Sequence, residues 1–362
     1  MDKFPKEFDS LESSVRSNAL KETMAYLRPF NMHCHTFFSY NGYGYSPTHV
    51  AAIAARQGWR AAGLVDFDVL DGVDEFLAAC ADLRVPAVAG METRVFVPEL
   101  AEAEINSPGE PGVAYHLGMN FRSSAVPAEW HSFAADLKAK ANGRTRQVVE
   151  KVNTVLSEIA LDFDAEAKKR TPAGNVTERH ICSAYREAAE KIFQGAELES
   201  FWTAKIGEYS ADAVKLEGKI RSKLMKQGGV GYVAPKPENF PTLQEMNAFI
   251  KGCGAVPTVA WLNGLSAGEA DPEALLELHV KNGAGAVTII PDRNWRASDP
   301  EKAAQLTAAM DRFLAACAKF KLPVLAGTEM NAPGQLIADD FTIAPLVKHL
   351  DAFIAGADKF AK

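Results

Sequence analysis

The 362-residue sequence lacks several features that would place it in a broad class at once. It has no apolar run of about 18 residues, so it predicts no membrane-spanning helix. Its first residues are charged and amphipathic, without the apolar centre of a signal peptide. Five cysteines are scattered without a CxxC pair, which is typical of reduced, mostly buried thiols. We therefore expect a cytoplasmic protein.

Positive charge is also in short supply. The chain carries 39 Lys and Arg against 46 Asp and Glu, a formal net charge of −7. Affinity for a phosphate backbone depends on clustered Lys and Arg, so we expect no nucleic-acid partner, short oligonucleotides in a local basic groove excepted. The composition, 47% hydrophobic and 23% charged, is that of an ordinary globular protein. A small-molecule partner fits these numbers best.

Short apolar runs alternate with amphipathic helical stretches along most of the chain. This alternation predicts right-handed βαβ units and a mostly parallel sheet, and near-regular spacing favours a closed or nearly closed barrel. The seven expected strands are 28–33, 61–66, 86–92, 113–119, 255–261, 286–290 and 323–328. A barrel of this kind accommodates a chain of this length.

One long helical stretch interrupts the alternation. Residues 127–228 carry helical periodicity with many charges and nothing that is typical of a strand. We therefore predict a barrel formed by 1–126 and 229–362, with 127–228 as a helical insertion. Function in such barrels sits at the carboxyl ends of the strands. Because the insertion follows the fourth strand, we expect it to leave from that face and to act as a lid.

Two histidines stand two residues apart at the end of the first expected strand. Residues i and i+2 of a strand point to the same side, so His33 and His35 can converge on one point. Two imidazoles aimed at one point suit Zn, Mn or Fe. Further potential ligands stand in or just after other expected strands, namely Asp66, Asp68, Glu92, His116 and Glu329. The pattern predicts a divalent metal site at the barrel mouth.

These residues lie in segments that resemble the PHP (polymerase and histidinol phosphatase) metal-dependent phosphoesterases, whose fold is a distorted (β/α)7 barrel. The resemblance covers nearly the whole chain, in the family's order and spacing. The similar segments are "HCHTFFSYNGYGYSP", "GLVDFDVLDGVDEFLAA", "VPAVAGMETRV", "GVAYHLGMNF", "NVTERHICSAYREA", "GGVGYVAPKPENFPTLQEMNAFIKGCGAVPTVAW" and "PVLAGTEMNAPG".

The resemblance implies three metal positions, of which this sequence retains only part. The first takes His33, His35, Glu92 and Glu329, where the family has Asp at the last position. The second shares Glu92 and adds His116, but its third ligand is replaced by Trp261. At the third position all three ligands of the family are replaced, by Asn41, Phe67 and Asn331. Because Phe67 and Trp261 are bulky and apolar, we expect them to fill the vacated space around a one- or two-metal site.

The resemblance also implies roles beyond the metal. Arg179 and His180 match a helix that faces the site in the family, so Arg179 is a candidate phosphate ligand and both are candidate catalytic groups. Asp66 or Asp68 would orient a ligand or act as general base, with a helix N-cap as the equally plausible alternative. Asn331, Asp292 and Arg293 are placed to bind substrate by position alone.

The function expected from these features is that of a metal-dependent hydrolase. The simplest form is a phosphoesterase that acts on a small phosphorylated metabolite or nucleotide through a metal-activated water. A non-catalytic PHP-like barrel that binds a ligand or partner is the main alternative, favoured by the altered positions. Hydrolysis of a non-phosphate bond at the reduced site is the third.

Overall fold

The computed structural model describes residues 27–362, and all seven expected strands are present in it. Each lies within a few residues of its predicted place. The strands are β1 (Asn31–Cys34), β2 (Ala62–Phe67), β3 (Ala87–Phe96), β4 (Val113–Phe121), β5 (Val256–Trp261), β6 (Ala286–Ile289) and β7 (Val324–Ala326). They form one sheet in chain order.

The sheet is a nearly closed barrel of mixed direction. Four of the six strand pairings are parallel, but β4 runs antiparallel to both β3 and β5. The first and last strands meet at the seam, where the backbone N–H of His35 donates to the carbonyl of Glu329 at 3.1 Å. The Asn31 amide adds a bond to the carbonyl of Thr328 at 2.9 Å. The predicted distorted (β/α)7 barrel is therefore confirmed as the fold class.

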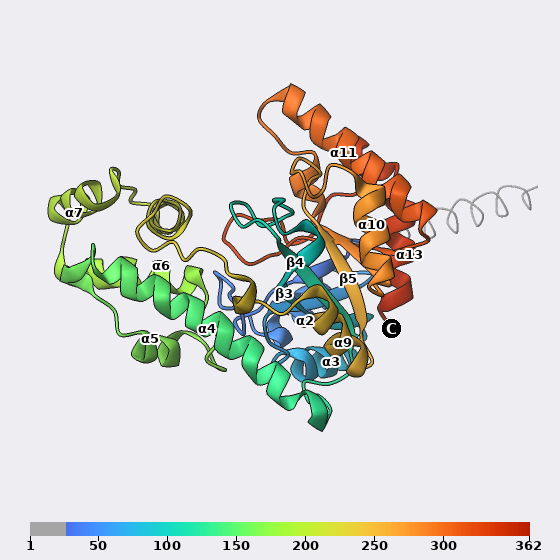
Figure 1. Ribbon diagram of the computed structural model, residues 1–362, viewed down its shortest axis with the longest axis horizontal. Helices are drawn as coiled ribbons and strands as arrows, with labels where there is room; N and C mark the ends of the chain where they lie inside the picture. Colours follow the sequence, from blue (N-terminus) through green and yellow to red (C-terminus); the bar gives the residue numbers. More distant parts are fainter. Residues whose placement is uncertain (1–26) are drawn as a thin grey trace, which may run out of the picture.

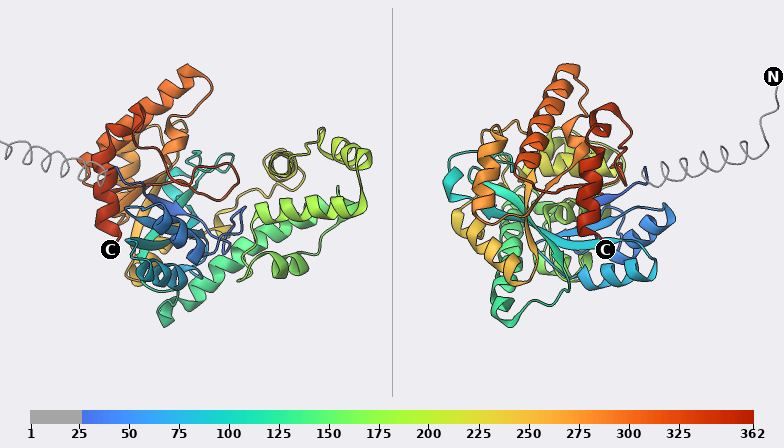
Figure 2. Two further views of the ribbon diagram at one scale, coloured as in Figure 1. Left: turned by 180° about the vertical axis from the view of Figure 1, so that it is seen from behind. Right: turned by 90° about the vertical axis from the view of Figure 1, so that its right-hand side faces the viewer.

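Helices ring the barrel on its outer side (Figure 2, right). Side-chain caps start several of them: Ser46, Thr242, Asp271 and Asp299 each accept from a backbone N–H in the first turn. The outer helices are α2 (Pro47–Arg56), α3 (Val73–Asp82), α9 (Leu243–Gly252), α10 (Pro272–Lys281), α11 (Pro300–Lys319), α12 (Ala344–Val347) and α13 (Leu350–Phe360). Short 3-10 turns η1 (Pro98–Leu100), η5 (Pro237–Asn239) and η6 (Pro291–Asn294) lie in the connections.

The chain between β4 and η5 is helical and extends to one side of the barrel (Figure 1). It has an apolar core of its own, built around the fully buried Trp202 and Tyr185. Its elements are η2 (Ala128–Trp130), α4 (His131–Asn153), η3 (Ser157–Ile159), α5 (Phe163–Arg170), α6 (Glu178–Ile192), α7 (Ala196–Ile206), α8 (Ala213–Ile220) and the π-helical turn η4 (Arg221–Met225). The division at 127 and 228 stays a prediction.

The antiparallel direction of β4 corrects one expectation. A strand that runs opposite to β1, β2 and β3 ends at the face opposite to their carboxyl ends, so the helical segment does not leave from the functional face. Helix α4 compensates because its 23 residues span about 35 Å. Side chains on α4, among them Thr145 and Val148, line the same cavity as His33 and Glu92.

None of the helices formed by residues 27–362 is long and apolar enough to cross a membrane.

Candidate metal centre

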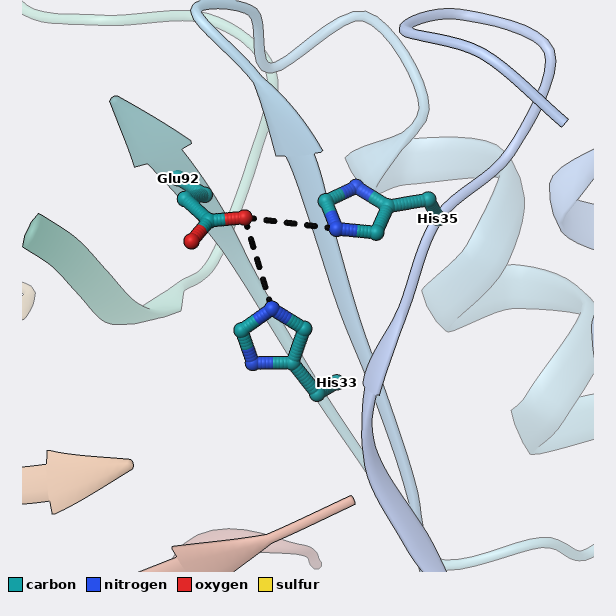
Figure 3. Close-up of side chains that lie close together, drawn as sticks. All are labelled: His33, His35 and Glu92. Atoms are coloured by element: carbon teal, nitrogen blue, oxygen red, sulfur yellow. Dashed lines mark hydrogen bonds and ion pairs between the residues drawn. The ribbon is translucent and has the colours of Figure 1, made fainter. Parts of the chain in front are cut away.

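Three buried side chains meet at the mouth of the barrel: His33 and His35 from the end of β1, and Glu92 from β3 (Figure 3). The Nε2 atom of each histidine lies 3.3 Å from Glu92 Oε2. One ligand atom from each of the three residues lies within 4.8 Å of the other two. The structure thus brings together the i and i+2 histidines of β1 and the carboxylate of β3, as the sequence predicts.

The spacing of these atoms fits a single divalent ion. A tetrahedral ion with bonds of about 2.0–2.1 Å separates its ligand atoms by roughly 3.3–3.4 Å, the separation seen between each imidazole and the carboxylate. His35 Nε2 is buried without a partner in hydrogen-bond geometry, and a cation would satisfy it. Two His and one Glu are also the donor set of catalytic zinc sites that leave a fourth position to water.

The hydrogen bonds of His35 prepare its Nε2 atom to bind a cation. Its Nδ1 lies 3.4 Å from Ser39 Oγ, and that hydroxyl donates to Asp66 Oδ1 at 2.7 Å. Because a hydroxyl has one proton, Ser39 accepts from Nδ1–H, so neutral His35 carries its lone pair on Nε2. His33 is held in a similar way, with Nδ1 3.3 Å from the hydroxyl of Thr288 on β6.

The charges of the three residues are strongly coupled. Burial opposes ionisation of Glu92, but the charge and hydrogen bond of His33, followed by His35, outweigh it and lower the pKa of Glu92 to about 2. Burial opposes protonation of His35, yet the nearby Glu92, Glu329 and Asp66 raise its pKa. The site is therefore built around a fixed carboxylate that attracts positive charge.

Asp66 supports the site from behind rather than facing the cavity. It accepts from the backbone N–H of Thr36 at 2.7 Å, from the Thr36 hydroxyl at 2.5 Å and from Ser39. Burial raises its pKa, against the opposing charge of His35 and these hydrogen bonds. Asp66 therefore holds the hydroxyl that contacts His35 and does not cap a helix, and its role as an orienter of a ligand stays a prediction.

Asp68 lines the cavity at the end of β2. It has a left-handed backbone, with φ of 59°, which Asp tolerates better than most residues. Its Oδ1 accepts from the hydroxyl of Thr93 at 2.6 Å. Of the two candidate aspartates, only Asp68 lies where a general base could reach a bound substrate.

Glu329 lies close to the three residues but is bonded elsewhere. Its carboxylate accepts from Arg293 Nη2 at 2.6 Å and from Asn331 Nδ2 at 3.2 Å. Burial opposes ionisation, but Arg293 and then His35 lower the pKa of Glu329. It would have to exchange Arg293 for the ion in order to become a fourth ligand. Arg293 and Asn331 both line the cavity, and their role in substrate binding stays a prediction.

The structure does not bring His116 to this site. The register pairs Glu92 with Leu117 and Thr93 with His116, so Glu92 and His116 point to opposite faces of the sheet. His116 is buried against the outer helices, with Nε2 2.7 Å from Asn247 Oδ1 and its ring stacked on His279. The expectation that His116 shares an ion with Glu92 is therefore corrected.

The same alternation turns the ring of Trp261 away from the metal ligands. Thr288, which contacts His33, pairs with Ala260, so the Trp261 ring lies on the outer face and stacks on Phe313 of α11, with ring centroids 4.3 Å apart. Trp261 still borders the cavity, but the expectation that its ring fills a vacated ligand space is corrected. Phe67 does face the site. Its ring stacks on that of His35, with ring centroids 4.4 Å apart, and Phe67 lines the cavity.

Two other candidate residues, His180 and Asp292, make contacts that stabilise the fold and do not point to a catalytic role. His180 is the N3 residue of a capping box, where its Nδ1 accepts from the backbone N–H of Thr177 at 3.1 Å. Burial, followed by the charge of Arg170, lowers the pKa of His180 to about 3. Asp292 pairs with Arg296 at 3.0 Å and does not line the cavity. Arg179 does line it, with its guanidinium 5.7 Å from the ring of Tyr40.

The cavity over His33 and Glu92 is large, about 880 Å³, and its wall includes cationic residues that the sequence did not single out. Arg94 could have been found, because it stands two residues after Glu92 on the same face of β3. The others come from the helical segment and carry no motif that marks them. The missed cationic residues are Arg94, Arg144, Arg221 and Lys226.

Comparison with solved structures supports the fold. An amidohydrolase from Chromobacterium violaceum, with bound sulfate and no metal, superposes with a TM-score of 0.57 at 18% identity, over 90% of this chain and 96% of its own. A proposed metal-dependent phosphoesterase from Bifidobacterium adolescentis gives 0.55 at 20% identity, over 89% and 96%. No protein-family model matches the sequence, and no curated protein matches it significantly.

Proposed function

We propose that this protein is a metal-dependent hydrolase, most simply a phosphoesterase of the PHP type that acts on a small phosphorylated metabolite or nucleotide. The observation that carries the proposal is the convergence of His33, His35 and Glu92, in which the buried Nε2 of His35 lies 3.3 Å from Glu92 Oε2 without hydrogen-bond geometry. A structural role alone does not explain two histidines that aim their Nε2 atoms at one carboxylate oxygen. The fold shared with an amidohydrolase and a proposed phosphoesterase is compatible with either bond type.

The ion at this site, Zn, Mn or Fe, would lower the pKa of a bound water and so supply hydroxide near neutral pH. The chain's own residues do the rest. Thr288 and Ser39 hold the imidazoles, and Asp68 is the group placed to accept a proton in the cavity. Arg179 and Arg293 offer positive charge to the leaving group and the phosphoryl oxygens.

We propose one ion rather than the three of the resembling family. Trp261 and His116 lie on the outer face of the sheet, so no second cluster forms from them. Asn41 and Phe67 provide no metal ligand at the third position: the Asn41 amide is used by the loop backbone, and Phe67 stacks on His35. The five cysteines are all free, in keeping with the cytoplasmic location that we propose.

Metal analysis and activity test the proposal together. Protein purified without chelators and reconstituted with Zn, Mn or Fe should bind about one ion per chain and hydrolyse a member of a phosphorylated-metabolite panel. His35→Ala should lose the ion and at least about 100-fold of the activity, because it removes one of three ligands. His49→Ala, an exposed histidine outside the cavity, is the matched control. Metal content near zero in the wild type, or full activity in His35→Ala, would refute the proposal.

A further inference from the structure

Arg144 on α4 is a cation that lines the cavity and lacks an ion pair within the described residues. Its Nε atom is buried and has no hydrogen-bond partner. Within residues 27–362 its one hydrogen bond runs from Nη1 to the carbonyl of Asn239 at 2.8 Å, and it forms no ion pair. A guanidinium has five N–H donors, so most of those of Arg144 remain for a group that enters the cavity.

The surroundings of Arg144 increase its positive potential. Arg94 and Arg144 both lie over the ring of Phe240, at 5.1 and 4.6 Å from its centroid. Arg94 is neutralised by Glu110 at 2.6 Å, whereas Arg144 is not. Burial and the charge of Arg94 lower the pKa of Arg144 to about 10, against the smaller opposing effect of Asp68 and Glu110, so Arg144 is still charged at neutral pH.

Most other cations of the cavity are already paired. Arg221 and Lys226 both contact Glu178, at 2.8 and 2.7 Å, and Arg293 contacts Glu329. A partly buried guanidinium without an ion pair costs free energy. The hydrogen bond to Asn239 uses one of its donors and the contact with Phe240 uses its face, so most of the N–H groups of Arg144 have no structural use, whereas binding of an anion would occupy them.

We propose that Arg144 binds an oxyanion group of the substrate, a phosphate or a carboxylate, and thereby determines which compounds the cavity accepts. The proposal rests on the proposed function in one respect, that the bound compound is the substrate of the metal centre. The planar guanidinium matches two oxygens of either anion at once, and the low-polarity contact with Phe240 strengthens that interaction. Arg144 thus acts as a specificity-determining residue contributed by the helical segment.

Anion binding to the metal-free, full-length protein tests this directly. Inorganic phosphate and, in a separate arm, succinate are titrated at constant ionic strength by calorimetry. We expect at least one of the two to bind, and Arg144→Met to weaken that binding at least about 10-fold, as expected when hydrogen bonds to a charged group are lost. Arg144→Lys keeps the positive charge but loses the planar guanidinium, so its affinity for the anion should lie between those of the wild type and Arg144→Met.

The stability of the same variants separates binding from folding. Without anion, Arg144→Met should melt near the wild-type temperature, because removal of a partly buried charge offsets the loss of the hydrogen bond to Asn239 and the contact with Phe240. Arg146→Met is the matched control, since Arg146 lies on the same helix but is exposed and paired with Asp164 at 2.6 Å. It should bind the anion as the wild type does.

The outcomes distinguish this inference from the hydrolase proposal. Failure of the wild type to bind either anion, or equal binding by Arg144→Met, overturns the anion site. Hydrolysis by the wild type with an unchanged KM in Arg144→Met also overturns it and leaves the hydrolase in place. Anion binding that depends on Arg144, in a protein that binds no metal and hydrolyses nothing, supports the anion site and refutes the hydrolase.

Discussion

At the scale of single residues, Asn41 shows why this site differs from the metal sites of the family that the sequence resembles. Its amide nitrogen donates to the carbonyls of His35 and Met330, at 3.1 and 2.9 Å. Its oxygen accepts from the backbone N–H groups of Tyr43 and Tyr45. A carboxylate could make only the second pair of bonds, so the loop that follows β1 requires the amide.

Asn41→Asp should therefore destabilise the protein rather than restore a metal ligand. The new carboxylate would face two carbonyl oxygens, and the loss of both donated hydrogen bonds should lower the free energy of unfolding by about 2–4 kcal/mol. Urea unfolding measures this change, and metal analysis of the same protein should still give about one ion per chain. Wild-type stability together with a second bound ion would contradict the account.

At the scale of elements, the outer helices hold the strands in place through close backbone contacts. Gly356 on α13 is the tightest of these, because a Cβ atom added there would lie 1.9 Å from the carbonyl oxygen of Val324 on β7. Helix α13 can approach β7 this closely only because residue 356 lacks a side chain. Strand β7 in turn leads directly into Glu329 and Asn331 at the cavity.

Gly356→Ala should destabilise the protein by several kcal/mol, about 2–4, because backbone must move to relieve the clash. Gly218→Ala on α8 is the matched control. An added Cβ at residue 218 meets nothing within 4 Å, so the higher helix propensity of Ala should stabilise that variant by up to about 1 kcal/mol. Thermal and chemical unfolding compare the two, and equal effects would show that the contact between α13 and β7 is looser than described.

At the scale of the whole molecule, the outer face of the sheet buries a pair of neutral histidines. His116 on β4 and His279 on α10 stack with ring centroids 5.9 Å apart, and the Nδ1 atom of each lacks a partner. Burial lowers the pKa of His116 to about 4, and burial together with the charge of His116 lowers that of His279 to about 3. His116 contacts Asn247 on α9 as well as His279 on α10, so it joins the sheet to both helices. Protonation of these histidines therefore couples folding to pH.

The sign of that coupling follows from proton binding. Both histidines titrate near pH 6.5 when unfolded but stay neutral in the folded protein down to about pH 4, so the unfolded chain binds more protons between these values. Stability should be independent of these two groups above about pH 7 and fall as pH decreases. At pH 5 each histidine should cost about 2 kcal/mol.

His279→Leu isolates one of these groups. Between pH 7 and pH 5 the variant should take up about one proton fewer on unfolding than the wild type, measured as a smaller slope of unfolding free energy against pH. An identical slope for the variant and the wild type would show that His279 is protonated in the folded state.

The sequence by itself determined the local features: seven apolar runs that become strands, the i and i+2 spacing that aims His33 and His35 to one side, and the carboxylate that closes the site. These features depend on the two-residue alternation of side chains along a strand, which can be seen in the sequence without knowledge of the fold. Only the tertiary structure decided the direction of β4 and the faces on which His116 and Trp261 lie, because a motif does not state the register of a strand with its neighbours. It also decided that Arg144, 52 residues along the chain from Glu92, lines the same cavity, because that juxtaposition depends on the packing of α4 against the barrel.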